Sequence, residues 1–273
     1  MTILGWIASS YSSYYARTRN SAWTAASMLF LACALSHTRA QAGVTVGADA
    51  EYPVRDAREL IGALRDPQPA AQKAAKAVLE RADPAMIEDL LRYGRTSGQR
   101  ETAQKVMAKM GPKVVPTLLG LLESPELRNR AGAALFQVAG PESVVLVPEL
   151  LSCLRVKPEV SRYCGDTLIK VCGPKAAAHA PLLAKALTDS DPLVRVYAAT
   201  ALGRIGAHAK SAVPALVKAL DDGESAVRLR AAVALGEMRS AAREAAPALK
   251  KAASDPVTEV ARAAREALRR TRG

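Results

Sequence analysis

Aromatic residues are scarce in this chain of 273 residues. Only 4% of the chain is Phe, Trp or Tyr, although 49% is hydrophobic, and alanine and leucine dominate the apolar residues. Small apolar side chains let helices pack closely, whereas strands are enriched in aromatic and β-branched residues. The composition therefore favours an all-α fold and disfavours a β-sandwich.

Residues typical of catalytic and metal sites are also few. Beyond residue 42 the only histidines are His179 and His208, and each is followed by alanine. Neither lies in a cluster with Cys, Asp or Glu, or beside a nucleophile. The chain has no phosphate-binding glycine loop and no G-x-S-x-G motif. The sequence thus predicts a protein that is not an enzyme and has no metal or cofactor.

Acidic residues are absent from the N-terminal segment 1–42. This segment has two early basic residues, Arg17 and Arg19, an apolar run over 22–35, and the small-x-small sequence Ala40-Gln41-Ala42. Charge, short apolar core and cleavage motif follow in the order of a secretory signal peptide. The run is too short for a membrane span. We therefore predict a signal peptide at 1–42 and export, to the periplasm, of a mature chain without a membrane span.

Two alternatives for this segment remain open. The sequence from Leu29 to Cys33 resembles a bacterial lipoprotein cleavage box, which would anchor the chain at Cys33. A segment with Ser, Tyr and Arg but no acidic residue also suits an organelle transit peptide.

The rest of the chain is built from repeats. The segment 43–52 has no periodic pattern and is predicted to be a linker. After it, prolines that would open a helix recur at a nearly constant spacing, at Pro84, Pro116, Pro148, Pro181, Pro214 and Pro247. Glycines that would close a helix follow at Gly111, Gly140, Gly173 and Gly206. A fixed period of this length indicates an array of helical pairs over 53–273.

The best-formed unit spans 180–206. Its first half carries an apolar face that includes Leu183 and Leu187, and its second half carries a stripe that includes Val194, Leu202 and Ile205. A pair this small buries too little apolar surface to be stable alone, so it needs similar neighbours. We predict seven units at 53–82, 84–111, 115–140, 147–173, 180–206, 213–239 and 246–271.

The repeats resemble the short bacterial type of HEAT repeat, as found in phycobilin lyases. The likeness is carried by VPALVKALDD at 213–222, AVR at 226–228 and AAVALG at 231–236, and LVR at 193–195 repeats part of it one unit earlier. The resemblance implies a right-handed α-α superhelix, a HEAT-like solenoid of about seven helical hairpins. It also implies that the second helices line the concave face.

In that family an acidic residue and an arginine six positions later often form a ladder between units. Asp189 with Arg195 and Asp222 with Arg228 fit this spacing. The third unit offers only Glu123 with Asn129. In the fourth unit, the expected acid is replaced by Val156.

The fourth unit is the least regular. It holds Cys153, Cys164 and Cys172, and Asp166 stands where a small apolar residue is expected. Cys153 and Cys164 would lie on antiparallel neighbouring helices, so a disulfide between them is one hypothesis. The alternative is that all three cysteines are small core residues. We expect Asp166 to pair with Arg162, one turn earlier.

A possible partner surface runs along the second helices. When the chain is aligned by the period of its prolines, Arg130, Tyr163, Val196 and Leu229 occupy one position in successive units, and Val171 stands where Arg204 does. Such a row either binds a protein or peptide partner or packs against the next unit. The sequence therefore predicts a non-enzymatic interaction scaffold in the bacterial envelope.

Two other functions stay open as alternatives. If residues 1–42 are removed, the chain keeps 35 basic and 26 acidic residues, a formal charge of +9 that would attract nucleic acid. Interspersed acids, few aromatics and export argue against that partner. A lyase is suggested only by the family likeness, and no catalytic residue supports it.

Overall fold

The computed structural model describes residues 53–155 and 158–272, all within one compact unit, Val44–Gly273. The predicted signal peptide, the predicted linker at 43–52 and Cys33 lie outside the described residues.

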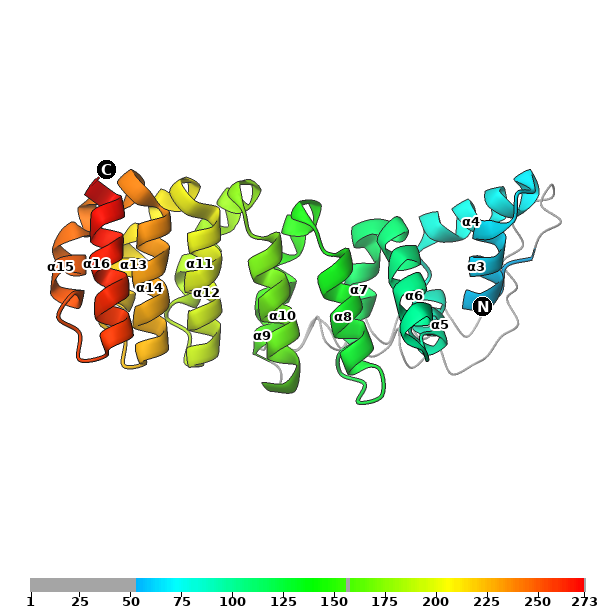
Figure 1. Cartoon of the computed structure of the whole chain (residues 1–273), viewed down its shortest axis with the longest axis horizontal. Coiled ribbons are helices and arrows are strands. Elements are labelled where there is room, and N and C mark those ends of the chain that lie inside the picture. Colours follow the sequence, from blue (N-terminus) through cyan, green and yellow to red (C-terminus); the bar gives the residue numbers. More distant parts are fainter. Residues whose placement is uncertain (1–52, 156–157, 273) are drawn as a thin grey trace, which may run out of the picture. The chain divides into compact units, whose positions relative to one another are not determined.

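The described residues form seven pairs of α-helices and contain no strand (Figure 1). This confirms the predicted all-α solenoid of about seven helical hairpins. The first helices of the pairs are α3 (Ala57–Arg65), α5 (Pro84–Tyr93), α7 (Val115–Leu121), α9 (Val147–Leu154), α11 (Ala180–Ala186), α13 (Val213–Ala219) and α15 (Ala246–Ala252). The second helices are α4 (Pro69–Arg81), α6 (Ser97–Met110), α8 (Arg128–Val138), α10 (Pro158–Val171), α12 (Pro192–Ile205), α14 (Ser225–Glu237) and α16 (Thr258–Arg272).

Short 3₁₀ helices, which the sequence reading missed, connect most pairs. They are η2 (Gly111–Val114), η3 (Pro141–Leu146), η4 (Pro174–His179), η5 (Gly206–Ala212) and η6 (Arg239–Ala245).

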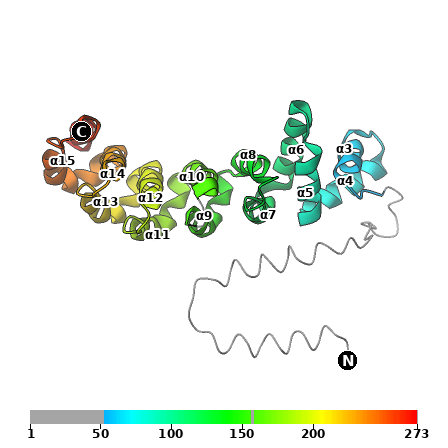
Figure 2. The same ribbon diagram turned by 90° about the horizontal axis from the view of Figure 1, so that it is seen from below.

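The helices form two layers, which Figure 2 shows clearly for α7 to α14. Each second helix from α4 to α14 contacts the next one along the array, and each also packs on the first helix of its own pair. Buried alanines, leucines and valines from all seven pairs form one continuous core. No single described helix has the length and apolar composition of a membrane span, although the bent pair Arg128–Val138 with Pro141–Leu154 meets those two criteria jointly.

Prolines and polar caps set the helix starts as expected. In α12, Pro192 lies in the first turn and the Asp191 carboxylate accepts the Leu193 N–H at 2.8 Å. Gly206 closes this helix with a φ of 64°, in the left-handed region that glycine tolerates. Gly140 and Gly173 have extended backbones instead, with φ of −130° and −156°, and precede the 3₁₀ helices η3 and η4.

Candidate functional site

Equivalent positions on successive second helices are not always separated by the same number of residues as equivalent positions on the first helices. The buried residues Leu154 and Val160 are separated by five residues, whereas the corresponding Leu187 and Val194 are separated by six. The turn inside the fourth pair is thus one residue shorter than the turn inside the fifth. Positions on α10 therefore correspond to positions on α12 at a spacing of 34, not 33.

At this spacing Tyr163 of α10 is equivalent to Tyr197 of α12, and both rings make the same kind of contact. Tyr163 lies over Gly132 of α8, and Tyr197 lies over Gly165 of α10, so that a Cβ atom at either glycine would overlap the ring. The Tyr163 hydroxyl also donates to Asn129 Oδ1 at 2.7 Å. Each tyrosine therefore packs against the preceding unit.

The five predicted partner-binding residues are thus not one row. Arg130 shares its repeat position with Tyr163, whereas Val196 shares its position with Leu229, and these four side chains are half-buried. Val171 is 2% exposed and belongs to the core. The prediction for Val171 is wrong because the shorter turn aligns it with the buried Ile205 and not with the exposed Arg204.

Asp166 is half-exposed at the junction of α10 and α12. Its carboxylate lies 3.8 Å from Arg162 Nε, the partner expected from the sequence, and accepts a hydrogen bond from the Tyr197 hydroxyl at 3.5 Å. Burial raises the pKa of Tyr197, and the charge of Asp166 raises it further. Tyr197 therefore stays protonated and can donate to Asp166.

An ion-pair ladder runs through the C-terminal pairs. Arg195 binds both carboxylate oxygens of Asp222 at 2.8 Å, and Arg228 binds those of Asp255 at 2.7 and 3.1 Å. Each arginine also donates to the carbonyl of the aspartate six positions before it. The predicted residues are therefore joined across pairs, and Asp255 extends the ladder into the seventh pair.

The ladder also reaches further back than the sequence pattern suggested. Arg155 of the fourth pair donates to Asp189 at 2.7 Å. In the third pair the ladder position belongs to Arg128 and not to Asn129, because Arg128 Nε donates to the Leu122 carbonyl at 3.0 Å. Position 122 is a leucine and not an aspartate, so it offers Arg128 a backbone carbonyl but adds no carboxylate to the ladder.

The three cysteines of the fourth pair lie in two different settings. Cys153 of α9 and Cys164 of α10 are placed as a disulfide, with their Cα atoms 6.1 Å apart. Cys172 is buried and free. Burial raises the pKa of its thiol to about 12, against a smaller lowering by the charge of Arg204.

We predict one titratable thiol in the oxidised mature chain beginning at residue 43. Denaturation without reductant should expose Cys172 alone, and reduction should raise the count to three. The variant Cys153→Ser should give two thiols before reduction, because Cys164 loses its partner. A count of three in the unreduced wild type would contradict the bond.

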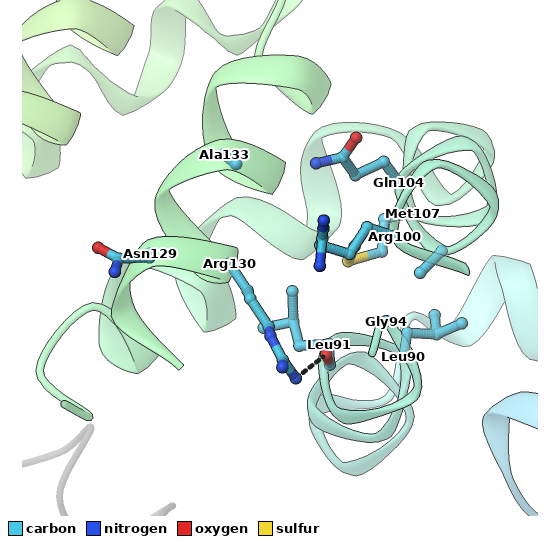
Figure 3. A pocket seen from close by; sticks show the side chains of 10 residues that line it. Leu90, Leu91, Gly94, Arg100, Gln104, Met107, Asn129, Arg130 and Ala133 are labelled. Carbon is cyan, nitrogen blue, oxygen red and sulfur yellow. Dashed lines mark hydrogen bonds between the residues drawn. The ribbon is translucent and has the colours of Figure 1, made fainter. Parts of the chain in front are cut away.

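A groove opens between the second and third pairs, where α6 lies beside α8 (Figure 3). Its volume is about 380 Å³, and α5, α6 and α8 supply its walls. The lining residues are Leu90, Leu91, Gly94, Arg100, Ala103, Gln104, Met107, Asn129, Arg130 and Ala133.

The tyrosine-over-glycine contact of the next two junctions is missing at the groove. The buried pair Ala103 and Met107 of α6 matches Ala131 and Leu135 of α8 at a spacing of 28, which places Gln104 where the next pair has Gly132. Arg130 takes the place of the tyrosine. Its side chain turns to α5 and donates to the Leu91 carbonyl at 3.1 Å, as Figure 3 shows, so the space beside Gln104 stays open.

Two guanidinium groups give the groove its charge. Arg100 donates to the Arg95 carbonyl at 3.2 Å, and Arg130 donates to Leu91. A guanidinium has five N–H donors, so most donors of both side chains remain available. The lining includes no acidic residue. Asn129 points away from Arg100 and Gln104 (Figure 3) and serves as the acceptor for Tyr163.

Sequence reasoning found Arg130 but missed the rest of the groove. The available signal was the small residue that recurs on the second helices as Gly132, Gly165 and Ala199, and that Gln104 replaces in the second pair. His179 and His208 lie in the connections η4 and η5. No group of three or more His, Cys, Asp or Glu that could hold a metal occurs in the described part of the chain.

Comparison with known proteins agrees with this architecture. Residues 180–269 match the family of HEAT repeats. No curated protein matches the chain.

Three solved structures are among those similar to the chain. An engineered protein is 23% identical (TM-score 0.48; 79% of this chain and 96% of that chain covered). A designed armadillo repeat protein in complex with the peptide (KR)4 is 21% identical (TM-score 0.47; 78% and 98% covered). Human deoxyhypusine hydroxylase is 20% identical (TM-score 0.36; 79% and 96% covered). The segment 180–269 thus carries HEAT repeats, and the described residues as a whole form a solenoid of seven stacked helical pairs.

Proposed function

We propose that the protein is a non-catalytic scaffold that binds another protein through the surface of its second helices, after export to the bacterial envelope. HEAT and armadillo-like repeats commonly mediate protein–protein interaction. The sequence pattern of residues 1–42 supports export.

The observation that carries the proposal is a set of arginines without carboxylate partners. Arg100, Arg130, Arg204 and Arg230 lie on the second helices α6, α8, α12 and α14. None of the four forms an ion pair with a carboxylate of the described residues. The ladder arginines differ, since their charge is used inside the array. Arginine is enriched in protein interfaces, and unpaired positive charge favours an acidic partner.

Affinity capture from envelope extract tests this function. Cell fractionation should first find the chain in the envelope. Changing Arg204 and Arg230 to glutamate, together with Arg162 of α10, which lies 3.8 Å from Asp166 on the same layer, should then reduce the captured protein by about tenfold, because the second-helix surface would repel an acidic partner.

The matched control changes three exposed lysines of the first helices, Lys185, Lys218 and Lys250, to glutamate. The charge change is the same, but it falls on the other layer, so capture should stay within about twofold of the wild type. Equal losses in both variants, or residence in the cytoplasm, would contradict the proposal.

A further inference from the structure

We propose that the groove between α6 and α8 is an anchor site for an acidic peptide segment of the partner, with a carboxylate held between Arg100 and Arg130. This inference rests on the proposed scaffold function and assigns its most specific contact. It starts from the one junction between second helices where a glutamine replaces the small residue of the later units.

The two arginines suit a carboxylate in charge and in their hydrogen-bond donors. Both reach the groove, from α6 and from α8, and their positions are held by hydrogen bonds to the carbonyls of Arg95 and Leu91. A planar guanidinium with free donors binds a carboxylate through two parallel hydrogen bonds. Because these side chains are already positioned, an acidic ligand would order little more of the protein on binding.

The floor of the groove favours a peptide. Leu90 and Met107 are fully buried beneath it, and Leu91 is 3% exposed, so the floor is formed by rigid core residues. Small apolar side chains of a peptide can lie on this floor while a neighbouring acidic side chain reaches the arginines. The Gln104 amide, which points into the gap in Figure 3, can donate to and accept from a peptide backbone.

Nucleic acid fits this groove poorly. The lining has no aromatic ring on which a base could stack. Glu88 of α5, Glu101 of α6 and Glu126, just before α8, belong to the segments that frame the groove, and they would repel a continuous phosphate backbone. A single carboxylate side chain avoids this repulsion because it enters between the two arginines.

Titration with a short peptide tests the site on the purified mature chain. The probe is a fluorescent hexapeptide of alanines with one central glutamate, which spans about 20 Å and is short enough to lie in this one groove. Changing Arg100 and Arg130 together to glutamine should weaken binding about tenfold or more. Changing the exposed first-helix lysines Lys185 and Lys218 together to glutamine removes the same charge outside the second-helix surface and should change affinity by less than about twofold.

A second variant closes the groove without relying on charge alone. Gln104→Gly with Arg130→Tyr recreates the pairing of Gly132 with Tyr163, so the new ring should fill the gap. Peptide binding should be lost, while the circular dichroism spectrum and the thermal midpoint stay at or above the wild-type values.

The outcomes separate the site from the scaffold function. Equal weakening by the arginine and the lysine double variants, undiminished binding to the closed variant, tighter binding of duplex DNA, or no binding of the peptide would each overturn the groove assignment. If envelope capture is still lost in the variant of Arg162, Arg204 and Arg230, the scaffold function survives that failure. If the peptide binds as expected but no envelope protein is captured, the scaffold function fails and the acidic-peptide site remains.

Discussion

Replacing Gly165 with valine lowers the free energy of unfolding by about 2 to 3 kcal/mol. Gly165 is buried in α10, and the ring of Tyr197 occupies the space where its side chain would be. Valine would push the ring away from α10, but the neighbouring Ala198 is fully buried, so α12 has little room to shift. The better helix propensity of valine offsets only about 0.5 kcal/mol of this cost. Urea unfolding followed by circular dichroism measures the change.

Two further variants show whether the clash is the cause. At Gly62, in α3, an added Cβ meets no atom within 4 Å, so Gly62→Val should stay within about 0.5 kcal/mol of the wild type. Combining Gly165→Val with Tyr197→Ala should cost less than the sum of the single changes, because the ring that clashes is gone. Strict additivity would show that the ring does not lie on Gly165.

The helical pairs were predictable because their boundaries depend on local chemistry. Proline cannot continue a helix but suits its first turn, and Pro148, Pro181 and Pro214 lie at the starts of α9, α11 and α13. The apolar period of each segment then determines which side is buried. The opening proline recurs in six units and the apolar period in all seven, so the number of units could be predicted from the sequence.

The surface of the second helices was harder to predict because the evenly spaced prolines from which the period was read lie on the first helices. One residue fewer in the turn shifts the alignment of the following helix by one residue. Each aligned position is then displaced by about 100° around the helix axis. Tyr163 was therefore aligned with Val196, although it packs as Tyr197 does. The exposed Arg155 was missed as the partner of Asp189 because it follows α9 directly, whereas the ladder pattern places its arginine on the second helix.

The groove depends on a contact between units that neither unit shows alone. Gln104 and Arg130 are ordinary residues on a helix surface, and their effect appears only where α6 meets α8. A single repeat period does not reveal this contact, because its two residues lie on different helices whose spacing varies. Comparison with the glycine that recurs in the later units, at Gly132 and Gly165, reveals Gln104 as the exception.

Replacing Arg195 with methionine lowers the free energy of unfolding by about 3 kcal/mol at pH 7. The Arg195 and Asp222 side chains are only 14% and 12% exposed, so the variant leaves Asp222 charged and largely buried without its bidentate partner. Arg195 also donates to the carbonyls of Asp189 and Ser190, which hold the turn before α12. Chemical unfolding at pH 7 gives the cost.

The exposed Arg204 on the same helix provides the matched control. It has no ion pair with a described carboxylate, so Arg204→Met should stay within about 0.5 kcal/mol of the wild type. Arg195→Lys keeps the charge but cannot bind both oxygens in one plane, so its cost should be intermediate. Adding Asp222→Leu to Arg195→Met should recover part of the loss, because no buried charge then remains unpaired. A cost for Arg204→Met equal to that for Arg195→Met would show that the ladder contributes nothing specific.

The dependence on pH gives an independent test of the same ion pair. Burial raises the pKa of Asp222, but the hydrogen bonds from Arg195 and the Glu224 N–H and the charges of Arg195 and Arg228 lower it more, so the net pKa lies below the usual range. A carboxyl group with a lowered pKa stabilises the fold fully above its unfolded pKa of about 3.9, and this stabilisation is lost as the pH falls through the folded pKa.

In Arg195→Met the main influence that lowers the pKa of Asp222 is gone and burial still raises it, so that variant has little of this stabilisation to lose. The difference between wild type and Arg195→Met should therefore be largest near pH 7 and shrink below about pH 4. A difference that stays constant from pH 7 to pH 3 would mean that Arg195 stabilises the array by packing and by its carbonyl hydrogen bonds, and not through the charge of Asp222.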